Sequence, residues 1–427
     1  MRYKNLYLKS LNFIKNKGGK MRTILHSDLN NFYASVEVLK HPEYAGKPLA
    51  VCGSVEDRHG IVLAKNQIAK GFDIKTGEVL WQAKQKCKDL VTVLADHTSY
   101  EIMSKKVRKI YERFTDNIEP FGIDECWLDV TDCTKIFGSG EQIAHKIRQT
   151  VKEELGLTVS IGVSFNKVFA KLGSDMKKPD AVTVIDINNF KDKVWPLDAK
   201  DLLFVGKSTY AKLNSIGVHT IGDIAKLDQT VLSSLLGVWG NTLYSYANGL
   251  DNSPVEKHAS DVKSIGNSLT SYKDLYSFEE VKTLLLLLSE SVASRLRESG
   301  LGKAMTVKVT VTDNELQNYG KQAKLTHPTS SGIEIANVAY ELFEKVYQWR
   351  SPVRAAGVSI CDFTHSLEQM YFDDDKAKHD KLERLDMAID DIRKKYGNSS
   401  MQRARILQDK KFASTDIKGD PFGKNIE

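Results

Sequence analysis

Three carboxylates lie at the boundaries of strand-like segments, and their positions suggest a metal site. Asp28 ends the segment "RTILHSD", and Asp124 and Glu125 precede the alternating segment "CWLDV". An isolated acidic pair beside β-type sequence usually marks a turn or a solvated edge. A hairpin carrying Asp124 and Glu125 beside the strand of Asp28 would instead gather three like charges, which repel unless cations bind among them. Hard oxygen ligands favour Mg²⁺ or Mn²⁺, and two such ions in one site serve phosphoryl transfer.

Lysines that could hold phosphate groups occur in two other segments. Lys167 and Lys171 lie four residues apart, on one side of a helix predicted to begin near Asn166. Lys167 fits a solvated helix face, whereas the apolar neighbours of Lys171 would let its ammonium reach into a cleft as a phosphate counter-charge. The segment "GIVLAKNQIAKGFDIKTGEVL" offers three more lysines, among which spacing does not choose: Lys65, Lys70 and Lys75.

The elements that must position these residues fall into three parts. In the first, strand-like runs such as "PLAVCG" and "LTVSIGVS" alternate with amphipathic stretches at 100–114 and 141–155, which predicts an α/β or α+β half. Short helices punctuated by glycine follow, and then a polar linker, "GLDNSPVEKHASDVKS". Beyond it a strand and helix pattern occurs twice, with helices at 278–299 and 332–347, which predicts an α+β sheet domain.

The polar tail beyond about residue 366 contains one amphipathic helix. Its apolar residues are three or four positions apart, and we expect this face to need a partner, either the body of the protein or another protein. These residues are Leu382, Leu385, Ile389 and Ile392.

Length and charge limit the number of domains and the ways in which this chain could bind nucleic acid. A chain of 427 residues is expected to form two to four domains. Six of its 61 basic residues and none of its 55 acidic residues lie in residues 1–20, so the whole net charge of +6 belongs to this N-terminal extension. Any binding of nucleic acid must therefore use local basic faces or backbone amides.

Targeting signals and disulfides are not expected. The extension lacks the apolar core of a secretory signal, and no stretch reaches the length of a membrane span. A downstream start at Met21 or an added leader accounts for the extension as well as a functional arm does. Five cysteines without a CxxC pair fit a reducing cytosol and argue against a zinc site, so we expect a cytoplasmic protein.

Three long blocks carry a specific resemblance. "SDLNNFYASVE", "FGIDECWLDVT" and "VSIGVSFNKVFAKLGSDMKKPDAVTVI", in this order, resemble the hallmark blocks of the Y-family DNA polymerases, the bacterial translesion enzymes of the DNA polymerase IV and V kind. The resemblance implies an α+β multidomain fold, a right hand with palm, small fingers, a helical helix-hairpin-helix thumb and an α+β little finger. The implied boundaries are an extension at 1–20, the palm at 21–31 and 97–190, the fingers at 32–96, the thumb at 191–255, a linker at 256–264, the little finger at 265–365 and a tail at 366–427.

The resemblance also implies a metal-binding role for the carboxylates. In this family the residues matching Asp28, Asp124 and Glu125 bind two catalytic Mg²⁺ ions, for which Mn²⁺ can substitute. The backbone carbonyl at the position of Leu29 is a further ligand.

Nucleotide binding is implied for a second set of residues. Tyr33 matches the steric gate, whose ring lies under the incoming sugar and excludes a 2′-hydroxyl, while Phe32 is left open between core and nucleotide pocket. The residue matching Lys171 contacts the triphosphate. Lys70 and Gln67 depart from relatives that often have arginine and tyrosine there, so we expect looser or differently shared triphosphate binding.

DNA binding is implied for the glycine-punctuated segment and the last domain. The segment "LLFVGKSTYAKLNSIGVHTIGDIA" resembles the helix-hairpin-helix of the thumb, where Gly206, Lys207 and Gly217 would bring backbone amides to DNA phosphates. The alternative is an ordinary glycine-capped helix pair. Residues 264–362 hold eleven basic and eleven acidic residues, which predicts loose, distributive binding by the little finger.

The tail contains a short stretch that resembles a sliding-clamp motif. Gln369, Met370, Tyr371 and Phe372 approximate the glutamine-led apolar peptide that relatives dock on the clamp. The alternative is a linker with two exposed aromatic residues.

Together these features predict a template-directed, low-fidelity DNA polymerase that acts in translesion synthesis during DNA repair. It would be a monomer that adds dNTP to the 3′-hydroxyl of primer–template DNA without a proofreading exonuclease. The alternative is a non-catalytic DNA- or clamp-binding subunit of the same shape. Relatives of that sort lack one or more metal carboxylates, whereas Asp28, Asp124 and Glu125 are all present.

Overall fold

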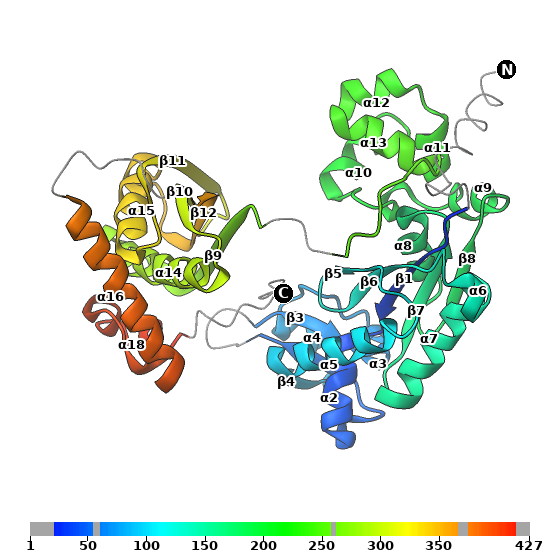
Figure 1. Ribbon diagram of the computed structural model, residues 1–427, viewed down its shortest axis with the longest axis horizontal. Coiled ribbons are helices and arrows are strands. Elements are labelled where there is room, and N and C mark those ends of the chain that lie inside the picture. The colour runs from blue at the N-terminus through cyan, green and yellow to red at the C-terminus, as the bar shows by residue number, and fades with distance from the viewer. Residues whose placement is uncertain (1–20, 54–59, 258–261, 366–374, 416–427) are drawn as a thin grey trace. The chain divides into compact units, whose positions relative to one another are not determined.

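The computed structural model describes residues 21–53, 60–257, 262–365 and 375–415, and the chain divides into two compact units (Figure 1). The first unit comprises residues 1–52 and 62–259, and the second comprises 53–61 and 260–427. The N-terminal extension and the stretch from Gln369 to Phe372 lie outside the described residues. Among the described residues, no helix combines the length and apolarity needed to cross a bilayer.

A five-stranded sheet forms the centre of the first unit. Its strand order is β5-β6-β1-β7-β8, and β1 is antiparallel to both of its neighbours. Every residue of β1 and of β7 is buried, so both faces of the sheet are covered at its middle. The strands are β1 (Ile24–Leu29), β5 (Ile118–Phe121), β6 (Glu125–Asp129), β7 (Val159–Ser164) and β8 (Val182–Ile185).

Helices pack closely on both faces of this sheet. A Cβ on Gly162 of β7 would lie 1.9 Å from the carbonyl oxygen of Ala170, so only glycine lets α8 (Lys167–Met176) approach this strand. The next residue, Val163, points to the opposite face. There it lies against Gly140, the first residue of α7 (Gly140–Leu155). The remaining helices of this part are α2 (Phe32–Lys40), α5 (His97–Tyr111) and α6 (Thr134–Phe137).

A smaller sheet with its own apolar core lies in the same unit. Its order is β3-β2-β4, with β2 antiparallel to β3 and parallel to β4. Ala50, Cys52 and Val62 are buried together against two short helices. The elements are β2 (Leu49–Cys52), β3 (Val62–Lys65), β4 (Val91–Leu94), α3 (Gln67–Gly71) and α4 (Leu80–Lys86), with a short 3-10 helix at Pro42–Tyr44.

Short helices around a separate core complete the first unit. Leu213, Ile221 and Leu243 are fully or nearly fully buried there, as the glycine-punctuated pattern predicts. Gly217 closes the turn between α10 (Lys207–Asn214) and α11 (Ile221–Lys226) with φ +77°, which favours glycine. The elements are α9 (Phe190–Val194), α10 (Lys207–Asn214), α11 (Ile221–Lys226), α12 (Gln229–Leu236) and α13 (Val238–Ala247), with a 3-10 helix at Ala199–Asp201.

The second unit contains a four-stranded antiparallel sheet of order β11-β10-β12-β9. Along β10 buried Val307 and Val309 alternate with exposed Lys308 and Thr310, so one face is covered and the other is exposed. The elements are β9 (Ser264–Leu275), α14 (Phe278–Ser299), β10 (Lys303–Asp313), β11 (Asn318–Thr329), α15 (Gly332–Val346) and β12 (Val353–Thr364).

The amphipathic helix of the tail packs within the second unit through charged groups more than through its apolar residues. Ile389 is buried, but Leu385 is 45% exposed. The side chain of Asp386 is more buried than either of them, and it accepts hydrogen bonds from the backbone N–H of Gly332 and from the guanidinium group of Arg403. The elements are α16 (Asp375–Tyr396), α17 (Ala404–Leu407) and α18 (Lys410–Ser414), with a 3-10 helix at Asn398–Ser400.

Candidate active site

Strand register brings the three carboxylates together at one end of the central sheet. Asp28 lies opposite Glu125 in the antiparallel pair β1–β6. Asp124 is in the turn just before β6, and its carbonyl accepts a hydrogen bond from the backbone N–H of Leu29 at 3.0 Å. The structure thus has the hairpin beside β1 that the sequence predicts. The strand β1 ends one residue later than predicted, at Leu29.

Two lysine ammonium groups lie among these carboxylates. Lys171 Nζ is 2.7 Å from Glu125 Oε2 and 3.7 Å from Asp28 Oδ2. Lys178 Nζ is 2.7 Å from the same oxygen of Asp28 and 2.8 Å from Asp175 Oδ1. Sequence reasoning selected Lys171 but missed Lys178, although it lies in the quoted block "SDMKKPD". Three carboxylates, those of Asp28, Glu125 and Asp175, therefore share two ammonium groups. The charges of the same two lysines also act on Asp124, without a direct ion pair.

His26 is a further member of the site that sequence reasoning missed. Its ring is fully buried, with Nδ1 2.8 Å from Ser174 Oγ and Nε2 3.3 Å from Glu125 Oε2. His26 and Asp28 are two residues apart on β1, so their side chains point to the same face. This period of two in "HSD" is the sequence signal that could have revealed the contact.

Burial and charge set the pKa values of the three carboxyls apart. Burial raises the pKa of Asp28 to about 7, although the neighbouring Lys178 ammonium opposes this shift. Burial, with a smaller contribution from the charge of Glu125, also raises the pKa of Asp124. Burial alone would raise the pKa of Glu125, but the hydrogen bond from His26 and the charge of Lys171 prevail and lower it to about 2. Burial thus disfavours the ionised forms of Asp28 and Asp124, whereas Glu125 stays ionised.

The donor set fits divalent cations of the Mg²⁺ class. It consists of carboxylate oxygens together with the backbone of Leu29, the residue after Asp28 at the same end of β1. Glu125 Oε2 already meets one cation, the Lys171 ammonium at 2.7 Å, so a metal ion at this oxygen would take the place of that ammonium group. Hard oxygen ligands of excess negative charge are what Mg²⁺ or Mn²⁺ requires.

An aromatic stack adjoins the carboxylates. Tyr33 stacks on Tyr100 with ring centroids 4.1 Å apart and an interplanar angle of 12°, and His97 meets it edge-on. Burial, and to a smaller extent the charge of Asp124, raises the pKa of the Tyr33 phenol. Phe32 is only 3% exposed and lies in the core behind Tyr33. The ring of Tyr33 is therefore fixed between the core and the acidic cluster.

The other predicted phosphate and DNA ligands lie on exposed elements. Gln67 and Lys70 are exposed on α3, and Gly206 caps the N-terminus of α10, followed by exposed Lys207. Gly217 lies in the turn after this helix. These contacts stay predictions.

Lys167 has a different environment from the solvated face that its position suggests. Its ammonium is 2.6 Å from Glu119 and 4.5 Å from the centre of the Trp127 ring, and the side chain is 12% exposed. Lys167 is thus engaged in structural contacts, one turn of α8 away from Lys171.

Comparison with protein families identifies two regions of the chain. Residues 27–175 match the impB/mucB/samB family, and residues 262–371 match the C-terminal domain of the same family. DNA polymerase IV of Acetivibrio thermocellus is 54% identical over 393 residues, which cover 91% of this chain and 98% of that protein. DNA polymerase IV 1 of Bacillus subtilis is 34% identical over 417 residues, covering 96% of this chain and 98% of that protein.

Solved structures show the same similarity. A Y-family DNA polymerase chimera of Dbh and Dpo4 superposes with a TM-score of 0.72 at 26% identity, covering 81% of this chain and 100% of the chimera. DinB from Sulfolobus solfataricus superposes with a TM-score of 0.54 at 27% identity, covering 80% of this chain and 99% of that protein. The α+β multidomain architecture predicted from sequence is confirmed.

Proposed function

The chain belongs to the Y-family of DNA polymerases, and on that premise we propose that Asp28, Asp124 and Glu125 are the catalytic centre of a translesion DNA polymerase. The observation that carries the proposal is the convergence of these three carboxylates at the end of the central sheet. The reaction is nucleotidyl transfer from dNTP to the 3′-hydroxyl of a primer paired with template DNA. Lesion bypass and the absence of proofreading follow from family membership.

The three carboxylates and the carbonyl of Leu29 would hold two divalent ions, Mg²⁺ or Mn²⁺. When bound, such ions lower the pKa of the primer 3′-hydroxyl and neutralise negative charge on the triphosphate and on the leaving pyrophosphate. The chain itself contributes a rigid frame, because Asp28 and Glu125 are paired across β1 and β6. His26 positions the Glu125 carboxylate from the buried side.

Lys171 and Lys178 would change partners when the site is loaded. Their ammonium groups contact Glu125 and Asp28 at 2.7 Å. Divalent cations on these carboxylates would take over that neutralisation, and both ammonium groups would then face the anionic triphosphate. Triphosphate binding would thus use Lys171, as the resemblance implies, together with Lys178, with Lys70 and Gln67 from α3 as further contributors.

Tyr33 would select the sugar of the incoming nucleotide. Its ring is held by the stack on Tyr100 and the edge contact with His97, so it cannot give way easily to a 2′-hydroxyl. Phe32 would support this ring from the core and not touch the nucleotide, given its burial.

Binding of primer–template DNA would involve the thumb and the exposed face of the little finger. The N-terminus of α10, with Gly206 and Lys207, and the turn at Gly217 would offer backbone amides to phosphates. The domain boundaries predicted from sequence, clamp binding by Gln369 to Phe372, a monomeric state and a cytoplasmic location remain part of the proposal.

Primer extension tests this function directly. Wild-type protein with Mg²⁺ should extend a primed template, and Asp124→Asn should reduce the rate by about 10³-fold or more, because electrostatic stabilisation of the transferring phosphoryl group is lost. Asp116→Asn, at an exposed aspartate, is the matched control and should keep full activity.

Two results would contradict the proposal. Equal extension by Asp124→Asn and wild type would remove the assigned centre. A wild-type protein that binds primed DNA but is inert with both Mg²⁺ and Mn²⁺ would favour the non-catalytic binding subunit instead.

A further inference from the structure

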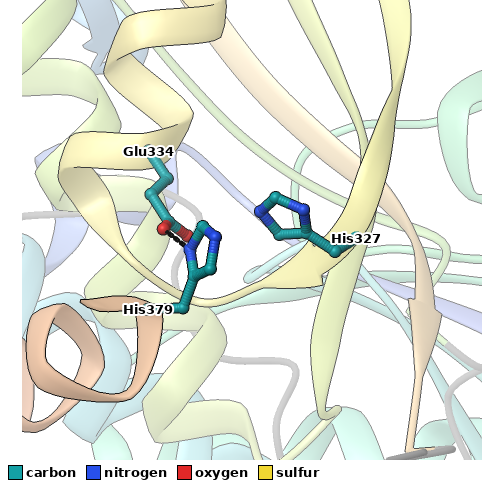
Figure 2. A group of neighbouring side chains, drawn as sticks. All are labelled: His327, Glu334 and His379. Atoms are coloured by element: carbon teal, nitrogen blue, oxygen red, sulfur yellow. Dashed lines mark hydrogen bonds and ion pairs between the residues drawn. The ribbon is translucent and has the colours of Figure 1, made fainter. Parts of the chain in front are cut away.

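A second group of potential metal ligands lies in the other unit of the chain. His327 near the end of β11, Glu334 in the first turn of α15 and His379 in α16 point toward one another (Figure 2). One ligand atom from each of them lies within 4.8 Å of the other two. We propose that these three side chains form a binding site for a transition-metal ion of the Zn²⁺ class, which ties α16 to the sheet domain.

The contacts within the group resemble those of a ligand set. The Nδ1 atom of His379 contacts a carboxylate oxygen of Glu334, and the rings of His327 and His379 have centroids 4.1 Å apart. The side chains of Glu334 and His379 are only 14% and 17% exposed. The site is thus sheltered but open to an ion from solvent. The protein supplies three ligands, and water would take the fourth position of a tetrahedral ion.

The donor set also suits a divalent ion. Two neutral imidazoles each present a nitrogen lone pair, and the Glu334 carboxylate adds one negative charge.

Neighbouring threonines orient two of the three ligands. The hydroxyl of Thr329 donates a hydrogen bond to the second carboxylate oxygen of Glu334 and accepts one from the backbone N–H of Ser331 at 2.9 Å. Thr326 Oγ1 lies 3.0 Å from His327 Nδ1, so we assign Nε2 of His327 as the ligand atom. Metal sites use such outer contacts to fix the rotamer and tautomer of their ligands.

The type of donor distinguishes this site from the carboxylate cluster of β1 and β6. Imidazole nitrogen suits Zn²⁺ and its neighbours in the transition series, whereas Mg²⁺ requires oxygen. The cysteine pattern argued against zinc, but it has no bearing on a site without cysteine. The three ligands are separated by six and by 44 intervening residues and belong to a strand and two helices, so no local motif reveals them.

Metal titration of the full-length chain tests the proposal. The tag-free protein is stripped with EDTA and titrated with Zn²⁺ in excess Mg²⁺, which occupies the oxygen site. We expect one Zn²⁺ per chain by calorimetry. Co²⁺ in its place should give the visible absorption of a four-coordinate ion. His379→Ala and His327→Ala should each weaken binding by about 100-fold, and Glu334→Gln by about 10-fold.

Two controls separate loss of ligands from loss of folding. His145→Ala removes an exposed histidine of α7 and should bind Zn²⁺ like the wild type. His379→Cys replaces one ligand by another and should restore binding, with a sulfur-to-metal absorption band in the Co²⁺ form. The proposal is overturned if the wild type takes up no Zn²⁺ under these conditions, or if His327→Ala and His379→Ala bind it as tightly as His145→Ala.

Discussion

Two acidic clusters of this molecule contain similar carboxylates and differ in the cations that neutralise them. In the central sheet of the first unit, Asp28 and Glu125 contact the ammonium groups of Lys171 and Lys178. In the second unit, α14 and α16 contribute carboxylates that contact guanidinium groups, and we call this set the arginine network. Its members are Glu290, Asp386 and Asp390 with Arg297, Arg393 and Arg403.

In the arginine network, both oxygens of Glu290 and both oxygens of Asp386 have hydrogen-bond partners within the protein. Glu290 accepts hydrogen bonds from Arg393 at 2.9 Å and from Arg403 at 2.6 Å, one to each oxygen. Asp386 contacts Arg403 with one oxygen and accepts a hydrogen bond from the backbone N–H of Gly332 with the other. Three carboxylates match three guanidinium groups here, and the planar guanidinium fixes their geometry.

The comparison teaches that burial of carboxylates alone does not identify an ion site. The arginine network is charge-balanced, so it has no need of a further cation. We call Asp28, Asp124, Glu125 and Asp175 with Lys171 and Lys178 the sheet cluster, and its carboxylates outnumber its ammonium groups. An ammonium group is a compact point charge on a flexible stem, so it can move to another anion. We infer that the arginine network is a structural cluster and that the pairs of Lys171 and Lys178 with Glu125 and Asp28 are exchangeable.

The sharpest test of this difference is stability. Glu290→Gln should destabilise the second unit by about 3 kcal/mol, because it leaves two partly buried guanidinium groups without a charged partner. Amide hydrogen exchange of α14 and α16 in the full chain measures this loss. Glu344→Gln, at an exposed position of α15, is the control and should change exchange by less than about 0.5 kcal/mol.

Asp124→Asn, in contrast, should not destabilise the first unit. The raised pKa of Asp124 means that its ionised form is disfavoured in the folded state, so removal of the charge should leave stability unchanged or raise it at neutral pH. If Asp124→Asn destabilised its unit as much as Glu290→Gln destabilises the other, the distinction between the clusters would fail.

Sequence predicts the local elements of both regions better than their contacts. The helix predicted over 278–299 is α14 with the same bounds, and the one predicted over 332–347 is α15, which ends one residue earlier. Both have long amphipathic patterns between clear ends. The approach of Asp28 to Asp124 and Glu125 was also predictable, because a hairpin carrying the acidic pair beside the strand of Asp28 brings the three carboxylates together.

Contacts between distant segments could not be predicted in this way. Arg393 and Arg403 reach Glu290 across 103 and 113 residues of chain. On α16 the apolar spacing places Leu385 on the face expected to be covered, but this side chain is exposed. The adjacent Asp386, which the apolar spacing leaves out, is buried. Which side of a polar helix is buried depends on partner groups that no local period encodes.

A second test concerns the ring beside the sheet cluster. An exchangeable site must also present a fixed group that selects the substrate, and we assign this role to Tyr33. Tyr33→Ala should raise ribonucleotide insertion relative to deoxyribonucleotide insertion by about 100-fold, or about 2.7 kcal/mol in discrimination. Single-nucleotide insertion kinetics with matched dNTP and rNTP measure it. Tyr33→Phe keeps the ring and should keep the discrimination, whereas an unchanged ratio in Tyr33→Ala would remove the assignment.

The smallest effect concerns the lysine that sequence reasoning missed. If Lys178 passes from Asp28 to the triphosphate, Lys178→Met should raise KM for dNTP by about 10-fold, or about 1.4 kcal/mol, with kcat less affected. The adjacent Lys177→Met removes an exposed lysine at the end of α8 and should leave KM unchanged. A Lys178→Met enzyme with wild-type KM but lower stability would show that this lysine is a fixed partner of Asp28. The sheet cluster would then be closed at that position, as the arginine network is throughout.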